Sequence, residues 1–263
     1  MKKIGFIGFG NMAGAIAQGI ITSGFLMADN LIGYDIDKRM IDKMKSLSIE
    51  TASDITNLIE KSEYVFIGVK PQVVESVLQP YVNCLKNKAI ISIVLGYDFE
   101  KYQGLLDSST RHIFVMPNTP ARVLQGMSLI EKTHSLTETE FNFVKKMFES
   151  IGCVEVVPSH LMGAAGTLSG CGPAFVYMMI EALADGAVKE GVPREMAYKL
   201  ASQTLQGAAS MQMQTQLHPG VLKDQVCSPG GSTICGVEAL EKGNLRATLM
   251  SAIFAAAHYN KGK

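Results

Sequence analysis

The chain has 263 residues, of which 24 are basic and 24 are acidic, so its formal net charge is zero, and 47% are hydrophobic. This length allows one large domain or two modest ones. The balanced charge excludes a strongly basic protein that binds nucleic acid or an anionic membrane through its overall field.

The cysteines give the first indication of location. There are five of them, an odd number without C-x-x-C spacing or a paired histidine pattern, at positions 84, 153, 171, 227 and 235. This pattern fits a reducing intracellular compartment, which we expect to be the cytoplasm, and it predicts no zinc site.

The chain opens with a motif for binding a dinucleotide. A short β-rich run, Lys3–Ile7, is followed by G-x-G-x-x-A and then by a helical pattern. In this arrangement Gly8 makes the tight turn, and Gly10 lets a pyrophosphate approach the backbone at the helix start. Ala13 keeps the helix close to the strand. The motif predicts a Rossmann-type site for a nicotinamide cofactor.

The second strand ends in a carboxylate. Leu31–Tyr34 leads into Asp35, which follows Ala13 by 22 positions, about where an acidic residue accepts hydrogen bonds from the adenosine ribose. Such a residue repels a 2′-phosphate and favours NADH. Lys38 and Arg39 come next, and they either bind that phosphate, favouring NADPH, or are solvated charges at a helix start.

Alternating strands and helices continue as far as Pro158. A capping box of Thr137 and Glu140 begins one helix, which Gly152 closes, and Gln72–Leu85 is predicted as another. The remaining predicted strands are Ile49–Thr51, Tyr64–Val69, Ala89–Val94, His112–Met116, Gly126–Glu131 and Cys153–Val157.

Two loops follow predicted strands on the side where open α/β sheets bind ligands. The first is Val69-Lys70-Pro71, in which Lys70 either faces the cofactor or solvates the loop. The second is Met116–Pro120, in which Asn118 is either a polar contact to the cofactor or a turn former between two prolines.

After Pro158 the sequence predicts helices only. We therefore expect two domains, a dinucleotide-binding domain over residues 1–158 and an all-helical domain over residues 159–263. The second is rich in Ala, Met and Gly, a composition that suits a bundle shared between two protomers. The predicted helices are Met162–Glu190, interrupted at Gly170–Pro173, and Arg194–Gln214, His218–Val226, Thr233–Lys242 and Leu245–Tyr259.

One part of this helical region resembles a membrane span. Leu161–Ile180 is uncharged over its twenty residues, which is long enough to cross a bilayer. Its many Gly, Ser and Thr residues and Pro173 make it only weakly hydrophobic. A helix buried between subunits is therefore the favoured interpretation, and no membrane association is expected.

The segment Asp224–Glu241 contains a glycine-rich turn between two helical patterns. Pro229, Gly230 and Gly231 break the helical pattern, and a new helix starts at Ser232-Thr233. A Gly-Gly pair before a helix start exposes backbone N–H groups in the positive field of the helix dipole, which can hold a carboxylate. The alternative is an ordinary interhelical turn.

Outside these turns the sequence shows few side chains in a catalytic pattern. The five histidines lie far apart without metal spacing or a nucleophilic partner, at positions 112, 134, 160, 218 and 258. A nicotinamide fold without an evident acid–base pair suits hydride transfer to an electrophilic acceptor such as a protonated imine.

Several of these motifs occur together, and in the same order, in one known family. They are GFGNM at residues 8–12, VKP at 69–71, MPNTP at 116–120, LSGCGPAF at 168–175 and the segment Asp224–Glu241. Over essentially its full length the chain closely resembles pyrroline-5-carboxylate reductase, the last enzyme of proline biosynthesis. The resemblance implies a Rossmann domain followed by an all-helical domain that interlocks with a partner into a homodimer, and in several members the dimers assemble into decamers.

The resemblance also implies roles for named residues. The turn would hold the carboxylate of 1-pyrroline-5-carboxylate through backbone amides, chiefly of Gly231, Ser232 and Thr233, and the Thr233 hydroxyl would hydrogen-bond the ring nitrogen. Hydride transfer to the imine carbon would then give L-proline. Family members commonly use NADPH, which we expect here with NADH as a second cofactor, although Asp35 departs from that pattern. The substrate-binding set is Ser228, Gly230, Gly231, Ser232 and Thr233, with Thr233 also catalytic, and the cofactor-binding set is Gly8, Gly10, Asn11, Met12, Asp35, Val69, Lys70, Pro71 and Asn118.

Two other functions remain open from the sequence. A related imine or β-hydroxyacid reductase could use the same architecture, but a β-hydroxyacid enzyme needs a catalytic lysine in its helical domain. Lys189 and Lys199 are the nearest candidates, and both have the pattern of surface residues. A cofactor-binding sensor is the third hypothesis, and the SPGGST turn argues against it because a sensor needs no carboxylate site.

Overall fold

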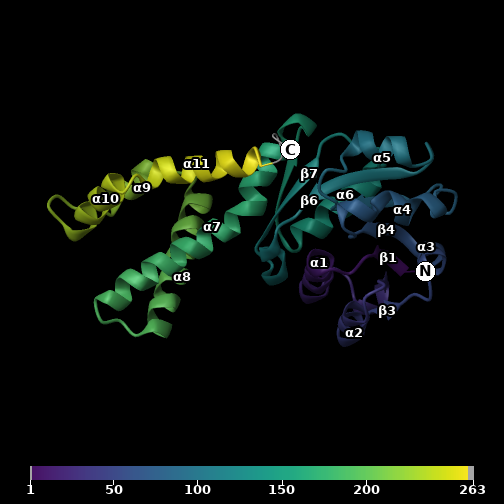
Figure 1. The fold of residues 1–263 in the computed structure, drawn as a ribbon, viewed down its shortest axis with the longest axis horizontal. Helices are drawn as coiled ribbons and strands as arrows, with labels where there is room; N and C mark the ends of the chain where they lie inside the picture. The colour runs from purple at the N-terminus through teal and green to yellow at the C-terminus, as the bar shows by residue number, and fades with distance from the viewer. Residues whose placement is uncertain (1, 260–263) are drawn as a thin grey trace. The chain divides into compact units, whose positions relative to one another are not determined.

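The computed structural model describes residues 2–259 and divides into two compact units, one up to Gly170 and one from Cys171. The division lies inside helix α7 (Met162–Lys189), which is continuous through it. Figure 1 follows the chain by colour from the first unit, purple to teal, into the helices of the second, green to yellow.

The first unit is built on one sheet of eight strands in the order β3-β2-β1-β4-β5-β6-β7-β8. All neighbours are parallel except β6 and β7, which are antiparallel. The chain leaves β1 towards β2 and later returns to its other side as β4, so a topological switch point lies between β1 and β4. The strands are β1 (Lys2–Ile7), β2 (Leu31–Tyr34), β3 (Glu50–Thr51), β4 (Ser62–Ile67), β5 (Ala89–Ser92), β6 (Arg111–Met116), β7 (Gly126–Glu131) and β8 (Gly152–Val157).

Both faces of this sheet are buried, each under its own hydrophobic cluster. Along β4, Tyr64 and Phe66 belong to one cluster while Val65 and Ile67 belong to the other. The first cluster includes residues of α1 (Asn11–Thr22) and α6 (Glu138–Glu149), and the second includes residues of α3 (Ile55–Lys61), α4 (Val74–Leu78) and α5 (Phe99–Leu105). Since successive side chains of a strand alternate between the faces, an uninterrupted apolar strand requires helices on both sides.

The predicted strands all form, and Leu31–Tyr34 and Gly126–Glu131 have the predicted bounds. The predicted helix Gln72–Leu85 is wrong in extent. It is replaced by α4 between two 3₁₀ turns, η2 (Pro71–Val73) and η3 (Gln79–Tyr81). Pro80 lies in η3 and cannot donate a backbone hydrogen bond, which ends the α-helical pattern there.

The predicted interruption of the long helix at Gly170–Pro173 is also wrong, since α7 runs from Met162 through Pro173 to Lys189. A proline inside a helix leaves the carbonyl four residues earlier without its usual donor, and here that carbonyl belongs to Ser169. The Asn118 side chain supplies a substitute, because its Nδ2 donates to the Ser169 carbonyl at 2.9 Å. The helix therefore continues past its proline.

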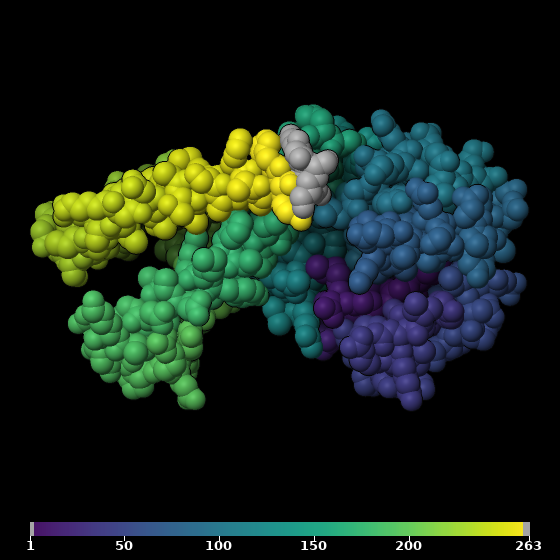
Figure 2. Space-filling model, in the orientation of Figure 1, coloured from purple at the N-terminus to yellow at the C-terminus, as the bar shows by residue number. Residues whose placement is uncertain are grey.

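The second unit has very little core of its own. Among its residues up to Tyr259, the buried apolar side chains are those of Ala184, Ala197 and Ala201. Large apolar side chains face outward instead, and Tyr177, Met178, Met250 and Phe254 are 61–69% exposed. Its helices after α7 are α8 (Arg194–Thr215), α9 (Pro219–Gln225), α10 (Ser232–Lys242) and α11 (Leu245–Ala257), green to yellow in Figure 2.

This combination confirms the predicted fold class, an α/β Rossmann domain followed by an all-helical region.

Over residues 159–189 the chain also meets the length and composition of a membrane span, with a mean hydropathy of 1.2 over its most apolar window. Exposed large hydrophobic side chains on several helices of one unit are typical of a subunit interface.

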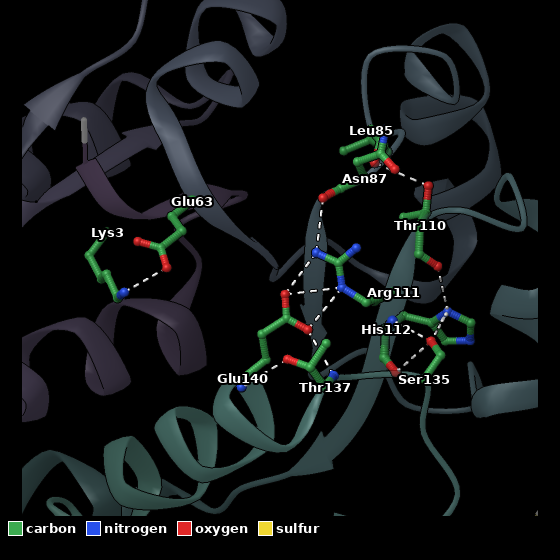
Figure 3. A network of polar contacts seen from close by, with 10 residues as sticks. All are labelled: Lys3, Glu63, Leu85, Asn87, Thr110, Arg111, His112, Ser135, Thr137 and Glu140. Carbon is green, nitrogen blue, oxygen red and sulfur yellow. Dashed lines mark hydrogen bonds and ion pairs between the residues drawn. The ribbon is translucent and has the colours of Figure 1, made fainter.

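A polar network fixes α6 to the sheet (Figure 3). Arg111, at the start of β6, donates from Nε to both carboxylate oxygens of Glu140 at 2.9 and 3.0 Å and from Nη2 at 2.7 Å. Glu140 also accepts from the backbone of Thr137 at 2.9 Å, which confirms the predicted capping box. Arg111 reaches the Asn87 carbonyl as well, at 3.0 Å. One carboxylate thus caps a helix and neutralises a partly buried guanidinium.

We expect Glu140→Ala to lower the free energy of unfolding by about 1.5–3 kcal/mol, because it removes the cap and leaves Arg111 without its anion. Burial opposes ionisation of Glu140, but the hydrogen bonds from Arg111 and Thr137 outweigh it and lower the pKa below the usual 4.5. A lowered folded-state pKa stabilises the fold fully above about pH 4.5, and this contribution is lost as the pH falls through the folded value.

Urea unfolding of both proteins at neutral pH and at about pH 3 would measure this difference, which should shrink in acid. Glu149→Ala is a matched control in the same helix, since Glu149 forms an exposed pair with Lys145 at 3.6 Å. It should cost about 0.5 kcal/mol or less. Equal losses in the two variants would contradict the role assigned to Glu140.

Candidate active site

The turn after β1 has the geometry of a dinucleotide-binding loop. Gly8 adopts a φ of +84° and donates its N–H to the Tyr34 carbonyl at 2.9 Å. A Cβ at Gly8 would lie 2.8 Å from Val69 Cγ1 and 2.9 Å from the carbonyl carbon of Gly68. Both the backbone conformation and the lack of space therefore require glycine at this position.

Gly10 differs from Gly8, because the folded chain itself does not require glycine there. It is the N-cap of α1 in an extended conformation, and a Cβ built on it would meet nothing within 4 Å. The space beside it is open to a ligand. Asn11 is exposed at the first helical position, whereas the Met12 side chain packs against the core. Met12 can therefore contribute its backbone N–H, one of the donors at a helix start that have no partner in the helix.

Asp35 ties this turn to the loop after β2. Its Oδ2 accepts from the backbone N–H of Phe9 at 2.7 Å, and its Oδ1 accepts from the backbone N–H of Asp37 at 2.9 Å. Both carboxylate oxygens thus have a protein donor, and each keeps a second lone pair for a ribose hydroxyl. The Asp35 side chain holds together the two loops that would bracket an adenosine.

The basic residues beyond Asp35 are not equivalent. Arg39 is paired with Asp37, the N-cap of α2 (Lys38–Ser46), through Nε at 3.2 Å and Nη2 at 2.7 Å. Hydrogen bonds from the Arg39 side chain and backbone lower the pKa of Asp37 below its ordinary value. Lys38 is exposed beside this pair. The guanidinium of Arg39, a candidate for binding the phosphate, is therefore already paired with a carboxylate of the protein.

The loop after β4 lies against the Gly8 turn across the switch point. Gly68 donates to the Ile7 carbonyl at 2.9 Å, and a Cβ at Gly68 would lie 2.7 Å from Ala13 Cβ. Val69 is partly buried against the core, Lys70 is exposed, and Pro71 begins η2. The loop thus presents the Lys70 side chain to solvent while Gly68 lets the two loops approach closely.

Asn118 is 7% exposed and makes two backbone contacts. Its Oδ1 accepts from the N–H of Met127 in β7 at 2.8 Å, and its Nδ2 donates to the Ser169 carbonyl of α7. This leaves one N–H of the amide for a ligand. The asparagine holds the loop after β6, where η4 (Thr119–Val123) begins, rather than projecting freely from it.

In the second unit, the SPGGST segment forms the predicted turn before α10. Gly230 has a φ of +69°, and Gly231 is the N-cap of the helix without a side-chain cap. The Gly231 N–H donates to the Ser228 carbonyl at 3.0 Å, which differs from its expected use as a ligand donor. In the described chain, the N–H groups of Ser232 and Thr233 have no acceptor.

These N–H groups lie at the start of an eleven-residue helix, where the dipole favours an anion. Ser232 and Thr233 are both exposed, so their hydroxyls can reach a ligand. A Cβ at Gly231 would lie 2.3 Å from Ser228 Oγ and 3.2 Å from the Ser228 carbonyl oxygen, so a larger residue would require the Ser228 side chain to turn away and the turn to shift slightly. The turn can hold a carboxylate without any charged side chain.

Four of the five histidines make contacts within the fold. His112 is buried and stacked on Phe99 at 4.6 Å, and burial lowers its pKa. His134 stacks on Phe141, His218 caps α9, and His258 contacts the Phe254 carbonyl. Within residues 2–259 there is no group of three or more metal-ligating side chains, and all five cysteines are free thiols.

Two residues at the carboxyl edge of the sheet were not predicted from the sequence to take part in a site. Gly68 directly follows a buried strand, and that position alone could have marked it as a place of close backbone approach. Asp37 was recognisable as the N-cap of a helix that begins with Lys38. Its pairing with Arg39 depends on side-chain geometry that spacing does not reveal.

Two family models match this chain. The model described as pyrroline-5-carboxylate reductase dimerisation matches residues 159–262. The model described as NADP oxidoreductase, coenzyme F420-dependent, matches residues 3–96. The first covers the turn before α10, and the second covers the loops after β1, β2 and β4.

Similar proteins extend over the whole chain. The pyrroline-5-carboxylate reductase of Arabidopsis thaliana is 42% identical and covers 97% of this chain and 93% of its own. That of Methanosarcina acetivorans is 39% identical over 99% and 97%. The crystal structure of the Plasmodium falciparum pyrroline carboxylate reductase with NADP bound is 33% identical, with a TM-score of 0.88 and coverage of 98% and 96%. At such identity over nearly the full length of both proteins, the chain belongs to the pyrroline-5-carboxylate reductase family.

Proposed function

We propose that this enzyme reduces 1-pyrroline-5-carboxylate to L-proline with NADPH, and that NADH also serves. The observation that carries the proposal is the 42% identity to a pyrroline-5-carboxylate reductase over 97% of the chain. It is supported by a Rossmann turn and a carboxylate-binding turn in one sequence. One proton and one hydride convert the imine to the amine, and the bound nicotinamide supplies the hydride.

The cofactor would lie at the carboxyl edge of the first unit's sheet. The open space at Gly10 and the donors of the first turn of α1 fit a pyrophosphate, and Asp35 fits a ribose hydroxyl. Asn118 would position its loop and offer one remaining N–H. The proposed cofactor-binding residues are Gly8, Gly10, Asn11, Met12, Asp35, Val69, Lys70, Pro71 and Asn118.

The substrate carboxylate would bind the N–H groups of Ser232 and Thr233, while Ser228, Gly230 and Gly231 shape the turn that exposes them. The Thr233 hydroxyl would then hydrogen-bond the ring nitrogen and fix the imine carbon for attack. A protonated imine is already electrophilic, so the protein needs mainly to position it and to balance its charge.

Residues 159–263 would form the dimerisation domain, and residues 1–158 the cofactor domain. The sparse core and exposed apolar helices of the second unit support association of two chains, as does the matched dimerisation model. We propose a homodimer that assembles further into a decamer and works in the cytoplasm, binding no nucleic acid or membrane.

The first experiment is a spectrophotometric assay at 340 nm with DL-pyrroline-5-carboxylate as acceptor and NADPH and NADH in parallel. We expect rapid oxidation with both cofactors and a higher kcat/KM with NADPH. A purified protein that binds NADPH but oxidises neither cofactor in the presence of this imine would refute the proposed reaction.

A further inference from the structure

We propose that Asp37 sets the preference between NADPH and NADH by holding Arg39 away from the adenosine 2′-phosphate. The inference rests on the proposed dinucleotide site and adds a residue to it. Asp37 would be a specificity-determining residue that acts through Arg39, and its removal would strengthen binding of NADPH without changing binding of NADH.

The position of the pair beside the site follows from Asp35. The carboxylate of Asp35 accepts from Phe9 in the loop after β1 and from Asp37 in the loop after β2. This bridge places the backbone of Asp37 one side chain away from the glycine-rich turn. In Rossmann sites the ribose 2′ position lies at this junction, and a nearby arginine accommodates a 2′-phosphate.

The guanidinium of Arg39 is already engaged there. Nε lies 3.2 Å from both carboxylate oxygens of Asp37, and Nη2 lies 2.7 Å from Oδ2. These two nitrogens form the edge of the guanidinium that would pair with two phosphate oxygens. A 2′-phosphate therefore has to compete with the Asp37 carboxylate for the same donors.

The pair can open without disturbing the fold. The Arg39 side chain is 84% exposed, so no packing holds it in place. Asp37 also caps α2, since its Oδ1 accepts from the backbone N–H of Arg39 at 2.9 Å. The four charged side chains of this loop are Asp35, Asp37, Lys38 and Arg39, two of each sign. Neutralising Asp37 therefore changes the local charge from balanced to positive.

Asp37→Asn isolates this effect. Asparagine caps a helix as well as aspartate does, so α2 is preserved while the competing charge is lost. We expect the Kd for NADPH to fall about threefold to tenfold, a change typical of one exposed charge-assisted contact, and the Kd for NADH to stay within about twofold. Titration of each cofactor by calorimetry measures both constants without turnover.

The double variant separates release of Arg39 from simple removal of repulsion. In an Arg39→Gln background, Asp37→Asn should give no gain for NADPH, because there is no guanidinium to release. If the full gain persists in that background, Asp37 merely repels the phosphate and the proposed role is overturned. Asp107→Asn is the matched control, since Asp107 is a partly exposed turn carboxylate that precedes β6, at the amino-terminal ends of the strands and so away from the loop after β2. It should change neither constant.

The outcomes also separate this inference from the proposed function. If the wild-type enzyme binds both cofactors and Asp37→Asn changes neither Kd, the inference fails and the dinucleotide site stands. If the folded wild-type protein binds neither cofactor, the dinucleotide site itself fails, and with it the role of Asp37.

Discussion

Replacing Thr233 by alanine is expected to lower kcat/KM for 1-pyrroline-5-carboxylate about 100-fold, the usual cost of losing one positioned hydrogen-bonding group in an active site. The Kd for NADPH should stay near the wild-type value, because Thr233 lies on α10 in the second unit, and the proposed cofactor residues all lie in the first. Thr233 is exposed, so its truncation leaves the fold intact. Initial rates with varied imine concentration measure the effect.

Thr233→Ser retains the hydroxyl and is the matched control, with an expected loss of less than about tenfold. Ser232→Ala removes a neighbouring hydroxyl but keeps both backbone N–H groups, so carboxylate binding through the backbone should persist. An unchanged kcat/KM in Thr233→Ala would remove this hydroxyl from the mechanism.

The second large effect concerns the two glycines of the β1–α1 turn. Gly10→Ala is expected to raise the Kd for NADPH about 10- to 100-fold, because the methyl group fills the space that the pyrophosphate needs. The free energy of unfolding should stay within about 1 kcal/mol of the wild-type value, since the backbone conformation suits alanine and the space is open in the folded chain.

Gly8→Ala provides the contrast. Its φ of +84° and the 2.8 Å approach to Val69 Cγ1 predict strain in the protein itself, with a loss of about 2–4 kcal/mol in the free energy of unfolding. Calorimetric titration and urea unfolding of both variants test the distinction. If Gly10→Ala lost as much unfolding free energy as Gly8→Ala, its weaker binding of NADPH could not be assigned to a clash between the methyl group and the pyrophosphate.

The parts of the fold that the sequence predicts depend on local signals. The turn at Gly8 and Gly10, the capping box at Thr137 and the strand ending at Tyr34 are encoded within a few residues each. Apolar strands flanked by turn residues are visible without knowledge of their neighbours. The prediction of which reaction is catalysed came from the family resemblance, which rests on short motifs in a fixed order.

The features that sequence analysis missed depend on contacts between distant residues. The helix α7 continues through Pro173 because Asn118 donates to Ser169, a pair separated by 51 positions. The pairing of Arg39 with Asp37 and the bridge made by Asp35 similarly depend on side-chain directions. Spacing in a sequence indicates which residues are near one another, but not which donor an acceptor selects.

The hydrogen bond from Asn118 to the Ser169 carbonyl also constrains how this sequence can change over evolution. Pro173 leaves the Ser169 carbonyl without a helical donor, and Asn118 supplies a donor to that carbonyl. The proline therefore depends on the asparagine, and the asparagine has this acceptor because of the proline. Losing Asn118 first would leave a carbonyl of α7 unsatisfied, whereas losing Pro173 first would restore the helical donor and make Asn118 partly redundant there. The two orders of substitution therefore differ in their cost to the fold. We expect substitutions at position 173 to become established before substitutions at position 118.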